Sequence, residues 1–478
     1  MICDKHEHAL IAEEPRGHHS KGNVMSAPDN TQAGASAELK RARRAAAGSF
    51  IGAVVEWYDF LLYGIVAALV FGELFFPDYS SHAGTLAAFA TFGVGFIFRP
   101  LGGIIFGHFG DRLGRKSMLV WTMTIMGVAT ALIGFLPTYQ SVGWLAPALL
   151  VLLRCIQGIA VGGEWGGAAL MAVESAPSKL RAFFSSGVQI GYSFGLLLAT
   201  GLVALLSSNF SAEAFLAWGW RIPFFFSAVL VIVGLWIRAG VEESEEYVER
   251  VKNAKTDKTA KLPILEAFKR YPAQIFQIVG LRFIELLTMY IVTTFALSYS
   301  TEQLGLDRQV MLNITLLVGG LGIVTIPAFA YLSDRYGRLR VYLTGGVIGL
   351  VSAVPFFLFL EAGNIVGIVI FAVLLINIAH DAVVSVQQPL FAEMFSPEFR
   401  YSGAGVGYQL ASAIAGGFTP FIATFLVGLG NGTWYLVAAY LGGGCLISIS
   451  IAMHLVRKWQ IGRRSERSTV ESTQVVSA

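Results

Sequence analysis

The sequence predicts an all-α membrane protein in which twelve transmembrane helices form two related halves of six. Composition is the first reason: 55% of the 478 residues are hydrophobic and only 14% are charged, against about 25% charged in an ordinary soluble domain. The second is the recurrence of apolar segments of about 20 residues, the length that crosses a bilayer as a helix. The third is a charged motif that occurs twice, about half a chain apart.

Twelve apolar segments lack the alternating pattern of membrane strands, and we therefore expect helices. They cover residues 49–76, 84–107, 117–137, 145–171, 182–207, 220–239, 272–300, 309–332, 340–360, 364–393, 401–428 and 433–456. On the fourth, Gly158, Gly162 and Gly166 form a stripe of small residues where another helix can approach closely.

The charged motif joins the second and third segments. It runs from Gly107 to Lys116 and is expected to form a tight turn at the membrane surface. A similar pattern returns at residues 334–340, and the offset from Asp111 to Asp334 is 334 − 111 = 223 residues. A second echo follows each motif: Glu174 precedes Arg181 by seven residues, and Glu393 precedes Arg400 by seven. This duplication predicts two halves that move against each other, as in a transporter.

Lysine and arginine collect in alternate loops, which predicts that both termini and both charged motifs lie in the cytoplasm. The predicted division is a disordered tail over 1–47, a six-helix half over 48–240, a linker over 241–270, a second half over 271–457 and a tail over 458–478. The linker is polar and of mixed charge, which is typical of a surface helix or a connecting segment.

Several kinds of site are not expected. The three cysteines, Cys3, Cys155 and Cys445, have no disulfide or metal-ligand spacing. The histidines of the leading tail fit no compact metal site, and we expect no metal and no cofactor. The net charge of +3 gives no reason to expect a nucleic-acid partner.

The motifs resemble those of a known family. Residues 107–116 are similar to the loop motif of the major facilitator superfamily. Residues 56–60 (Glu-Trp-Tyr-Asp-Phe) and 154–165 (Arg-Cys-Ile-Gln-Gly to Gly-Gly-Glu-Trp) are similar to motifs of its metabolite:proton symporter branch. The resemblance covers residues 38 to 456. It implies the major facilitator fold, a multi-pass protein of the bacterial cytoplasmic (inner) membrane, and proton-driven uptake of shikimate or a closely related hydroxylated carboxylate. Separately, we expect a monomer.

The resemblance also implies a latch at the cytoplasmic side. By motif match, Asp111 caps a helix of the second half, Arg115 meets Glu174, and Arg338 meets Glu393. Each such contact contributes about 0.3–1 kcal/mol, which suits a latch that must open. The expected gating residues are Gly107, Asp111, Arg112, Gly114, Arg115, Glu174, Asp334, Arg338 and Glu393.

Charged side chains inside the predicted helices indicate function, because each costs about 2.5–3.5 kcal/mol to insert. Asp59, Arg99, Arg154, Arg282 and His380 all fall near the centre of the membrane by helical rise. Proton coupling needs an acid or imidazole that responds to cargo. Asp59 is the first candidate, Glu164 and Glu56 follow, Glu285 is included, and the pair His380–Asp381 is a rival. We expect a basic residue to pair with the carrier until the substrate takes it.

A hydroxylated carboxylate needs one cationic fork and several neutral hydrogen-bonding groups. Arginine suits the fork, and Arg99, Arg154 and Arg282 are candidates that the sequence does not rank. The neutral candidates are Tyr63, Gln157, Gln189, Tyr192, Tyr290, Asn377, Gln387 and Gln388. For each residue the competing interpretation is a static buried pair that holds helices in register.

Other functions remain open at this stage. A member of the same branch could import a dicarboxylate such as 2-oxoglutarate or citrate, an aromatic acid, or proline and betaine. An enzyme of the membrane is disfavoured because no nucleophile–base–oxyanion set is evident. A channel would conduct without accumulating its solute.

Overall fold

The computed structural model describes residues 30–113, 115–162, 180–239, 263–396 and 399–476, with side chains for 48–106, 117–162, 180–237, 266–396, 399 and 403–458. It divides into two compact units, Met1–Ala42 and Arg43–Ala478. Apart from the start of α1, everything below concerns the second unit. Over the described residues it contains no strand, and twelve of its helices are long and apolar enough to cross a membrane. The predicted fold class is therefore confirmed.

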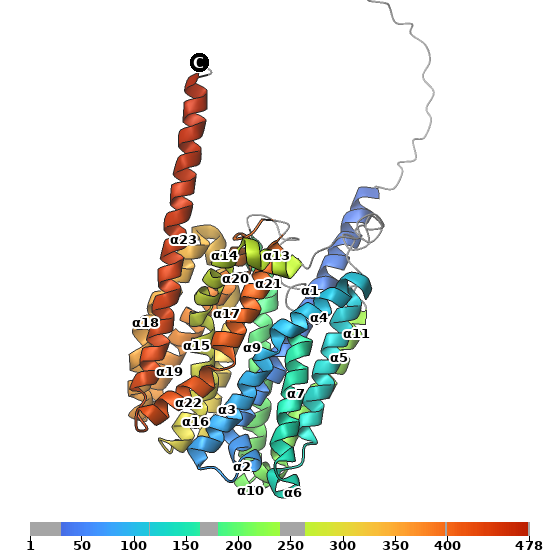
Figure 1. Ribbon diagram of the computed structural model, residues 1–478, viewed down its shortest axis with the longest axis vertical. Helices are drawn as coiled ribbons and strands as arrows, with labels where there is room; N and C mark the ends of the chain where they lie inside the picture. Colours follow the sequence, from blue (N-terminus) through green and yellow to red (C-terminus); the bar gives the residue numbers. More distant parts are fainter. Residues whose placement is uncertain (1–29, 114, 163–179, 240–262, 397–398, 477–478) are drawn as a thin grey trace, which may run out of the picture. The chain divides into compact units, whose positions relative to one another are not determined.

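The helices fall into two halves (Figure 1). The first half contains α1 (Asn30–Val66), α2 (Gly72–Phe75), α3 (Ser81–Ile97), α4 (Arg99–Leu113), α5 (Arg115–Gly134), α6 (Tyr139–Val142), α7 (Leu145–Gly162), α9 (Arg181–Asn209), α10 (Ala212–Ala217) and α11 (Ile222–Ala239). The second contains α13 (Pro263–Arg270), α14 (Pro272–Leu281), α15 (Phe283–Tyr290), α16 (Ala296–Glu302), α17 (Arg308–Tyr336), α18 (Arg338–Glu361), α19 (Ile365–Val373), α20 (Asp381–Ala392), α21 (Arg400–Ala411), α22 (Thr419–Leu429) and α23 (Tyr435–Val476).

The spans agree with the predicted ranges to within a few residues wherever both ends are described, from Gly48–Phe75 to Tyr435–Lys458. Helical structure extends further than expected at three places. The helix α1 begins at Asn30, inside the predicted tail, and α23 continues to Val476. The first charged motif is helical to Leu113 and again from Arg115, so it is a tight turn only around Gly114, which lies outside the described residues.

The duplication is visible in the backbone. Wide π-helical turns interrupt the first span at Ala67–Phe71 and the seventh at Ile291–Phe295. Their offset, 291 − 67 = 224 residues, matches that of the charged motifs. Two more π-helical turns, Leu374–His380 and Ser412–Gly416, lie in the tenth and eleventh spans. Such turns often mark functional positions, and His380 lies on one of them.

The second charged motif contains a sharp break between α17 and α18. Gly337 joins them with φ +101° and ψ 135°. That combination is open only to glycine. The break reverses the chain in one residue and fixes Asp334 and Arg338 on either side of it.

The halves meet through α9, which packs against α17 and α20, and through α3 and α4, which pack against α22 and α21. Large apolar side chains such as Trp121, Phe135 and Trp236 are exposed on the outside. In lipid this is the expected arrangement, because hydrocarbon solvates them.

The glycine stripe of α7 lets two backbones touch. A Cβ on Gly158 would overlap the carbonyl of Gly95, and a Cβ on Gly162 would overlap that of Arg99. Gly158 and Gly162 therefore do what the stripe predicts, while Gly166 lies outside the described residues.

We expect Gly158→Ala to lower the yield of folded protein severalfold and to reduce its thermal stability in detergent. The added methyl meets backbone and not a flexible side chain, so two helices must separate. Fluorescence-detected gel filtration after a heating series measures the effect. Gly187→Ala is the control, because nothing lies near a Cβ at that position. Equal stability of the two variants would contradict this account of the contact.

Candidate functional site

The charged side chains predicted for the membrane centre are all buried inside the protein. Asp59, Arg99, Arg154, Arg282 and His380 are each at most 4% exposed. Ions buried this deeply must be compensated by partners or by a bound ligand. Their partners therefore indicate which groups are structural and which remain available.

Arg282 is the arginine with the most hydrogen bonds among the three candidates. It makes a two-pronged ion pair with Glu285, with both nitrogen–oxygen distances at 2.8 Å, and both side chains are 1% exposed. Its remaining nitrogen donates to the Tyr408 carbonyl and the Ser412 hydroxyl, each at 2.7 Å. The guanidinium carbon also stacks 3.3 Å from the centroid of the Tyr408 ring. These bonds use four of the five N–H donors of Arg282, so little of its donor capacity is left for a ligand unless Glu285 is released.

Arg99 has the opposite character. Its guanidinium lies between two aromatic rings, 4.0 Å from the centroid of Phe60 and 4.1 Å from that of Phe96. Its buried Nε has no hydrogen-bond partner among the described residues. Glu56 acts on it as a counter-charge, and the rings of Tyr290 and Tyr408, from the second half, are also among its neighbours. Arg99 is therefore a desolvated cation with unused donor capacity, and it faces the other half.

Arg154 begins a chain of hydrogen bonds that ends at Asp59. Its Nη1 donates to Gln157 Oε1 at 2.9 Å, and Gln157 Nε2 donates to the Thr130 hydroxyl at 2.6 Å. Thr130 donates to Asp59 Oδ2 at 2.7 Å. Ser227, on α11, donates to the other carboxylate oxygen at 2.6 Å.

The expected direct pairing of Asp59 with a basic residue is absent among the described side chains. Asp59 lies between α1, α5 and α11, within the first half, and Arg154 acts on it only through space and through the chain. Glu56, one turn earlier, acts through its charge on Arg99. The shared helix face did not predict this, because α1 is surrounded by neighbours and nearby positions meet different ones.

The pair His380–Asp381 forms a second buried cluster in the other half. His380 Nδ1 lies 2.8 Å from Asp381 Oδ1. Asn377 and Thr325 both donate to Asp381 Oδ2. The His380 ring lies 4.9 Å from the Tyr192 ring of the first half, measured between centroids. This cluster therefore touches the interface between the halves.

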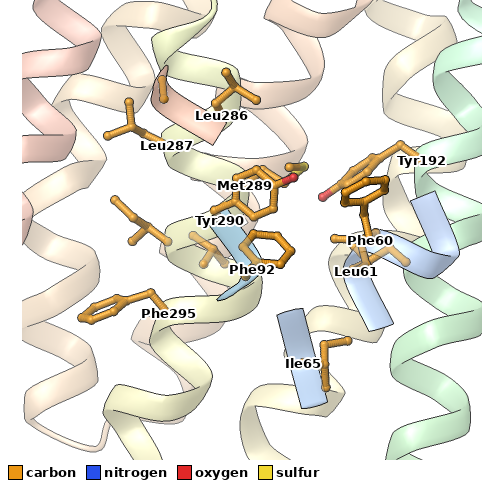
Figure 2. Close-up of a cluster of buried hydrophobic side chains, with 14 of the residues drawn as sticks. Phe60, Leu61, Ile65, Phe92, Tyr192, Leu286, Leu287, Met289, Tyr290 and Phe295 are labelled. Carbon is orange, nitrogen blue, oxygen red and sulfur yellow. The ribbon is translucent and has the colours of Figure 1, made fainter. Parts of the chain in front are cut away.

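Several buried polar atoms near that interface have no partner among the described residues. They are the hydroxyls of Tyr192 and Tyr290, both amide atoms of Gln388, and Oε1 of Gln387. Figure 2 shows Tyr192 and Tyr290 reaching toward one another, with Phe60 and Phe92 beside them. Buried polar groups are nearly always satisfied. Unsatisfied groups contributed by both halves therefore mark a site for a polar ligand.

Other predicted ligand groups are already engaged. Tyr63 shares a 2.6 Å hydrogen bond with Thr91, and Gln189 donates to the Val384 carbonyl at 3.3 Å. Asn377 donates to the Val318 carbonyl at 2.9 Å, and Gln387 Nε2 to Glu285 at 2.6 Å. These side chains organise the site more than they face it.

The halves are joined at both ends of the spans. At the hinge end, where α17 ends and α9 begins, Asp334 accepts hydrogen bonds from the backbone of Ala182 (3.2 Å) and Phe183 (3.0 Å). At the opposite end Thr85 donates to Glu302 at 2.7 Å. Asp334 thus caps a helix of the first half, the mirror image of the role that the resemblance implied for Asp111.

The expected contact between Arg338 and Glu393 is present. The side chains of Gly107, Asp111, Arg112, Gly114, Arg115, Glu164 and Glu174 lie outside the described residues.

Sequence reasoning missed Thr85, Glu302 and Thr130. Only Glu302 carries a charge, at the end of its helix, so the sequence held little to mark these three.

We expect Asp334→Ala to open the hinge end. A helix cap contributes about 0.5–2 kcal/mol, and this one joins the two halves. Spin labels on the exposed positions Phe184 and Tyr336 should then report a larger population of long distances.

Asp307→Ala is the matched control. Asp307 caps α17 by accepting from Gln309 within its own half, at 2.9 Å. The substitution Asp307→Ala therefore removes a helix cap without breaking a contact between the halves. Equal distance distributions for Asp334→Ala and the unmodified protein would refute the latch.

Comparison with known proteins agrees with this architecture. A family model described as sugar (and other) transporter matches residues 45–456. The chain is 63% identical over 415 residues to the shikimate transporter of Escherichia coli K12, covering 87% of this chain and 94% of that protein. It is 33% identical to the proline/betaine transporter of the same organism over 80% of this chain and 78% of that protein.

Solved structures share the fold. A D-xylose-proton symporter superposes with a TM-score of 0.66 at 17% sequence identity, covering 85% of this chain and 96% of that one. Twelve spans, two halves with buried polar groups between them, and the extent of the family match lead to one assignment. The chain is a multi-pass membrane transporter, and it belongs to the sugar (and other) transporter family of the major facilitator superfamily.

Proposed function

We propose that this transporter imports shikimate, or a closely related hydroxylated ring carboxylate, together with a proton. The observation that carries the proposal is Arg99, a buried arginine with an unused Nε, together with unpaired buried hydroxyl and amide groups that both halves contribute. One cation and several neutral donors and acceptors match a ligand with one carboxylate and several hydroxyls. The similarity to the E. coli shikimate transporter supports the same cargo.

Within this proposal Arg99 binds the carboxylate, and Tyr192, Tyr290 and Gln388 bind hydroxyls. Arg282 is a poorer candidate, because Glu285, Tyr408 and Ser412 already use its donors. Phe60 and Phe96 keep Arg99 out of water, which strengthens a charge-assisted hydrogen bond.

The proton carrier proposed first is Asp59. It is the buried acid joined by hydrogen bonds to Arg154, whose charge neighbours Arg99. Protonation there would let substrate and proton bind together, because the substrate brings one negative charge into the site and protonation removes one from Asp59. His380–Asp381, Glu285 and Glu56 are the rival carriers, and His380–Asp381 is favoured among them by its contact with Tyr192.

The cycle proposed is alternating access between the halves. The Asp334 cap on α9 would close one end and the Thr85–Glu302 hydrogen bond the other. We further propose that the hinge end and both termini are cytoplasmic, that the protein lies in the bacterial inner membrane, and that a monomer suffices, because one chain supplies every group named. The proton gradient supplies the energy and no cofactor takes part.

Uptake into proteoliposomes with an imposed pH gradient tests the function. Labelled shikimate should accumulate above its external concentration, and a proton ionophore should abolish the accumulation. Unlabelled proline, 2-oxoglutarate and protocatechuate should compete poorly. Equilibration without accumulation would indicate a channel, and strong competition by one of these solutes would redirect the assignment to that solute.

We expect Asp59→Asn to abolish pH-driven accumulation and to spare exchange of labelled for unlabelled substrate across the membrane. Asparagine keeps the shape: its oxygen can still accept from one of the two hydroxyls, Thr130 or Ser227, and its NH₂ group can donate to the other. It does not gain or lose a proton. Counterflow and gradient-driven uptake, measured on the same vesicles, separate the two activities. Accumulation retained by this variant would exclude Asp59 as the carrier.

A further inference from the structure

The series of hydrogen bonds from Arg154 through Gln157 and Thr130 to Asp59 has a fixed donor-to-acceptor direction. An arginine can only donate, so Gln157 must turn Oε1 toward Arg154 and its NH₂ group toward Thr130. The Thr130 oxygen therefore accepts from Gln157. Its single proton remains free to be donated elsewhere.

That proton has two acceptors within reach. Asp59 Oδ2 lies 2.7 Å from the Thr130 hydroxyl oxygen, and the carbonyl of Met126 lies 2.9 Å from it. When Asp59 is a carboxylate, the hydroxyl donates to it, and every bond from Arg154 onward points toward the negative charge. When Oδ2 carries a proton, that O–H must itself find an acceptor.

We propose that Thr130 couples protonation of Asp59 to Arg154 by turning its proton from the carboxylate to the Met126 carbonyl. One proton enters from solvent and forms the O–H bond on Oδ2, and no other covalent bond changes. Thr130 then accepts from both Asp59 and Gln157, which a hydroxyl oxygen can do. The rotation moves one hydrogen atom and no heavy atom.

The rotation would weaken the hydrogen bond that Arg154 makes to Gln157. Hydrogen bonds aligned toward an anion strengthen one another, and reversing the last one removes that support from the Gln157 contact. Arg154 is then held less firmly in the first half and turns its charge toward the substrate site. Because coupling is reciprocal, substrate bound near Arg154 would favour protonation of Asp59 by the same factor.

Among the described residues, no charged group other than Arg154 is found to act on Asp59. The groups that face Asp59 from α5 and α11 are the hydroxyls of Thr130 and Ser227. Arg154 on α7 acts by its charge, and Tyr58, the neighbour of Asp59 on α1, donates its hydroxyl to the Pro223 carbonyl at 2.7 Å. Thr130 is therefore a positioning residue between the carrier and the arginine.

The inference rests on the proposal that Asp59 carries the proton, and one experiment separates the two. Calorimetry of shikimate binding to the purified full chain, in two buffers of different ionisation enthalpy, counts the protons taken up per substrate. Thr130→Val keeps the shape of the side chain and removes the hydroxyl. We expect its proton uptake to fall about fivefold or more, with binding retained, while Thr130→Ser behaves as the unmodified protein does.

Thr124→Val is the control, because Thr124 lies on the same helix and donates to its own backbone, the Val120 carbonyl, at 2.7 Å; it should keep its proton uptake. Should Thr130→Val not fold, Gln157→Met interrupts the same chain one step away and should show the same loss. Normal uptake in either chain variant, with none in Asp59→Asn, would overturn the role of Thr130 and leave Asp59 as carrier. Normal uptake in Asp59→Asn would instead overturn the carrier itself.

Discussion

Replacing Arg99 by lysine will weaken substrate binding by about 100-fold while leaving the protein folded. The guanidinium is held between the rings of Phe60 and Phe96, with Nε unpaired. In that position it can present two parallel donors to a carboxylate. Lysine keeps the charge but offers a point donor on a flexible stem. Losing one charge-assisted hydrogen bond and the ring stacking costs about 3 kcal/mol, or about 100-fold in affinity.

Tryptophan fluorescence or calorimetry with shikimate measures this loss, and the same measurement on Arg221→Lys is the control. Arg221 is half-buried and donates to the carbonyls of Gly134 and Leu136, at 2.8 and 2.6 Å. It therefore closes a helix end far from the site, and its replacement should change stability more than affinity. Unchanged affinity in Arg99→Lys would move the carboxylate to Arg154 or Arg282.

Much of the site could be predicted from residue type alone. Exposing a charged side chain to lipid costs free energy, and such residues therefore face the protein interior. The burial of the five charged residues was predictable on this ground: Asp59, Arg99, Arg154, Arg282 and His380. Their pairing did not follow. Arg282 meets Glu285 because they lie three residues apart on one helix face, which the sequence does show. Asp59 and Arg154 lie on different helices, and whether they touch depends on packing that no local pattern records.

The connecting groups are the ones that sequence reasoning overlooked. Thr130 is a hydroxyl on a helix full of apolar residues, and most such hydroxyls simply donate to their own backbone. Thr130 has that option as well, in the Met126 carbonyl, and only the position of Asp59 gives it another. Likewise, the charge of Asp334 predicted a surface position, but not that the start of α9 would lie against it.

The buried pair Arg282–Glu285 gives the second large effect. Removing one member leaves a charge 1% exposed, and such a loss costs about 3–5 kcal/mol. We therefore expect Glu285→Met and Arg282→Met each to lower the melting temperature in detergent strongly. In Glu285→Met the amide of Gln387 also loses its acceptor, which adds to the cost.

The double variant Arg282→Met with Glu285→Met should recover most of the lost stability, because two apolar side chains of similar volume replace the pair and leave no charge behind. The same three substitutions at Arg338 and Glu393 form the matched comparison. That pair is also a direct contact between arginine and glutamate, but its side chains are 15% and 39% exposed, so water screens whichever charge remains and each single variant should cost about 0–1 kcal/mol. If the single variants at the two pairs lost equal stability, water would have to reach Arg282. A site so open to water would not hold Arg99 as the desolvated cation on which carboxylate recognition depends.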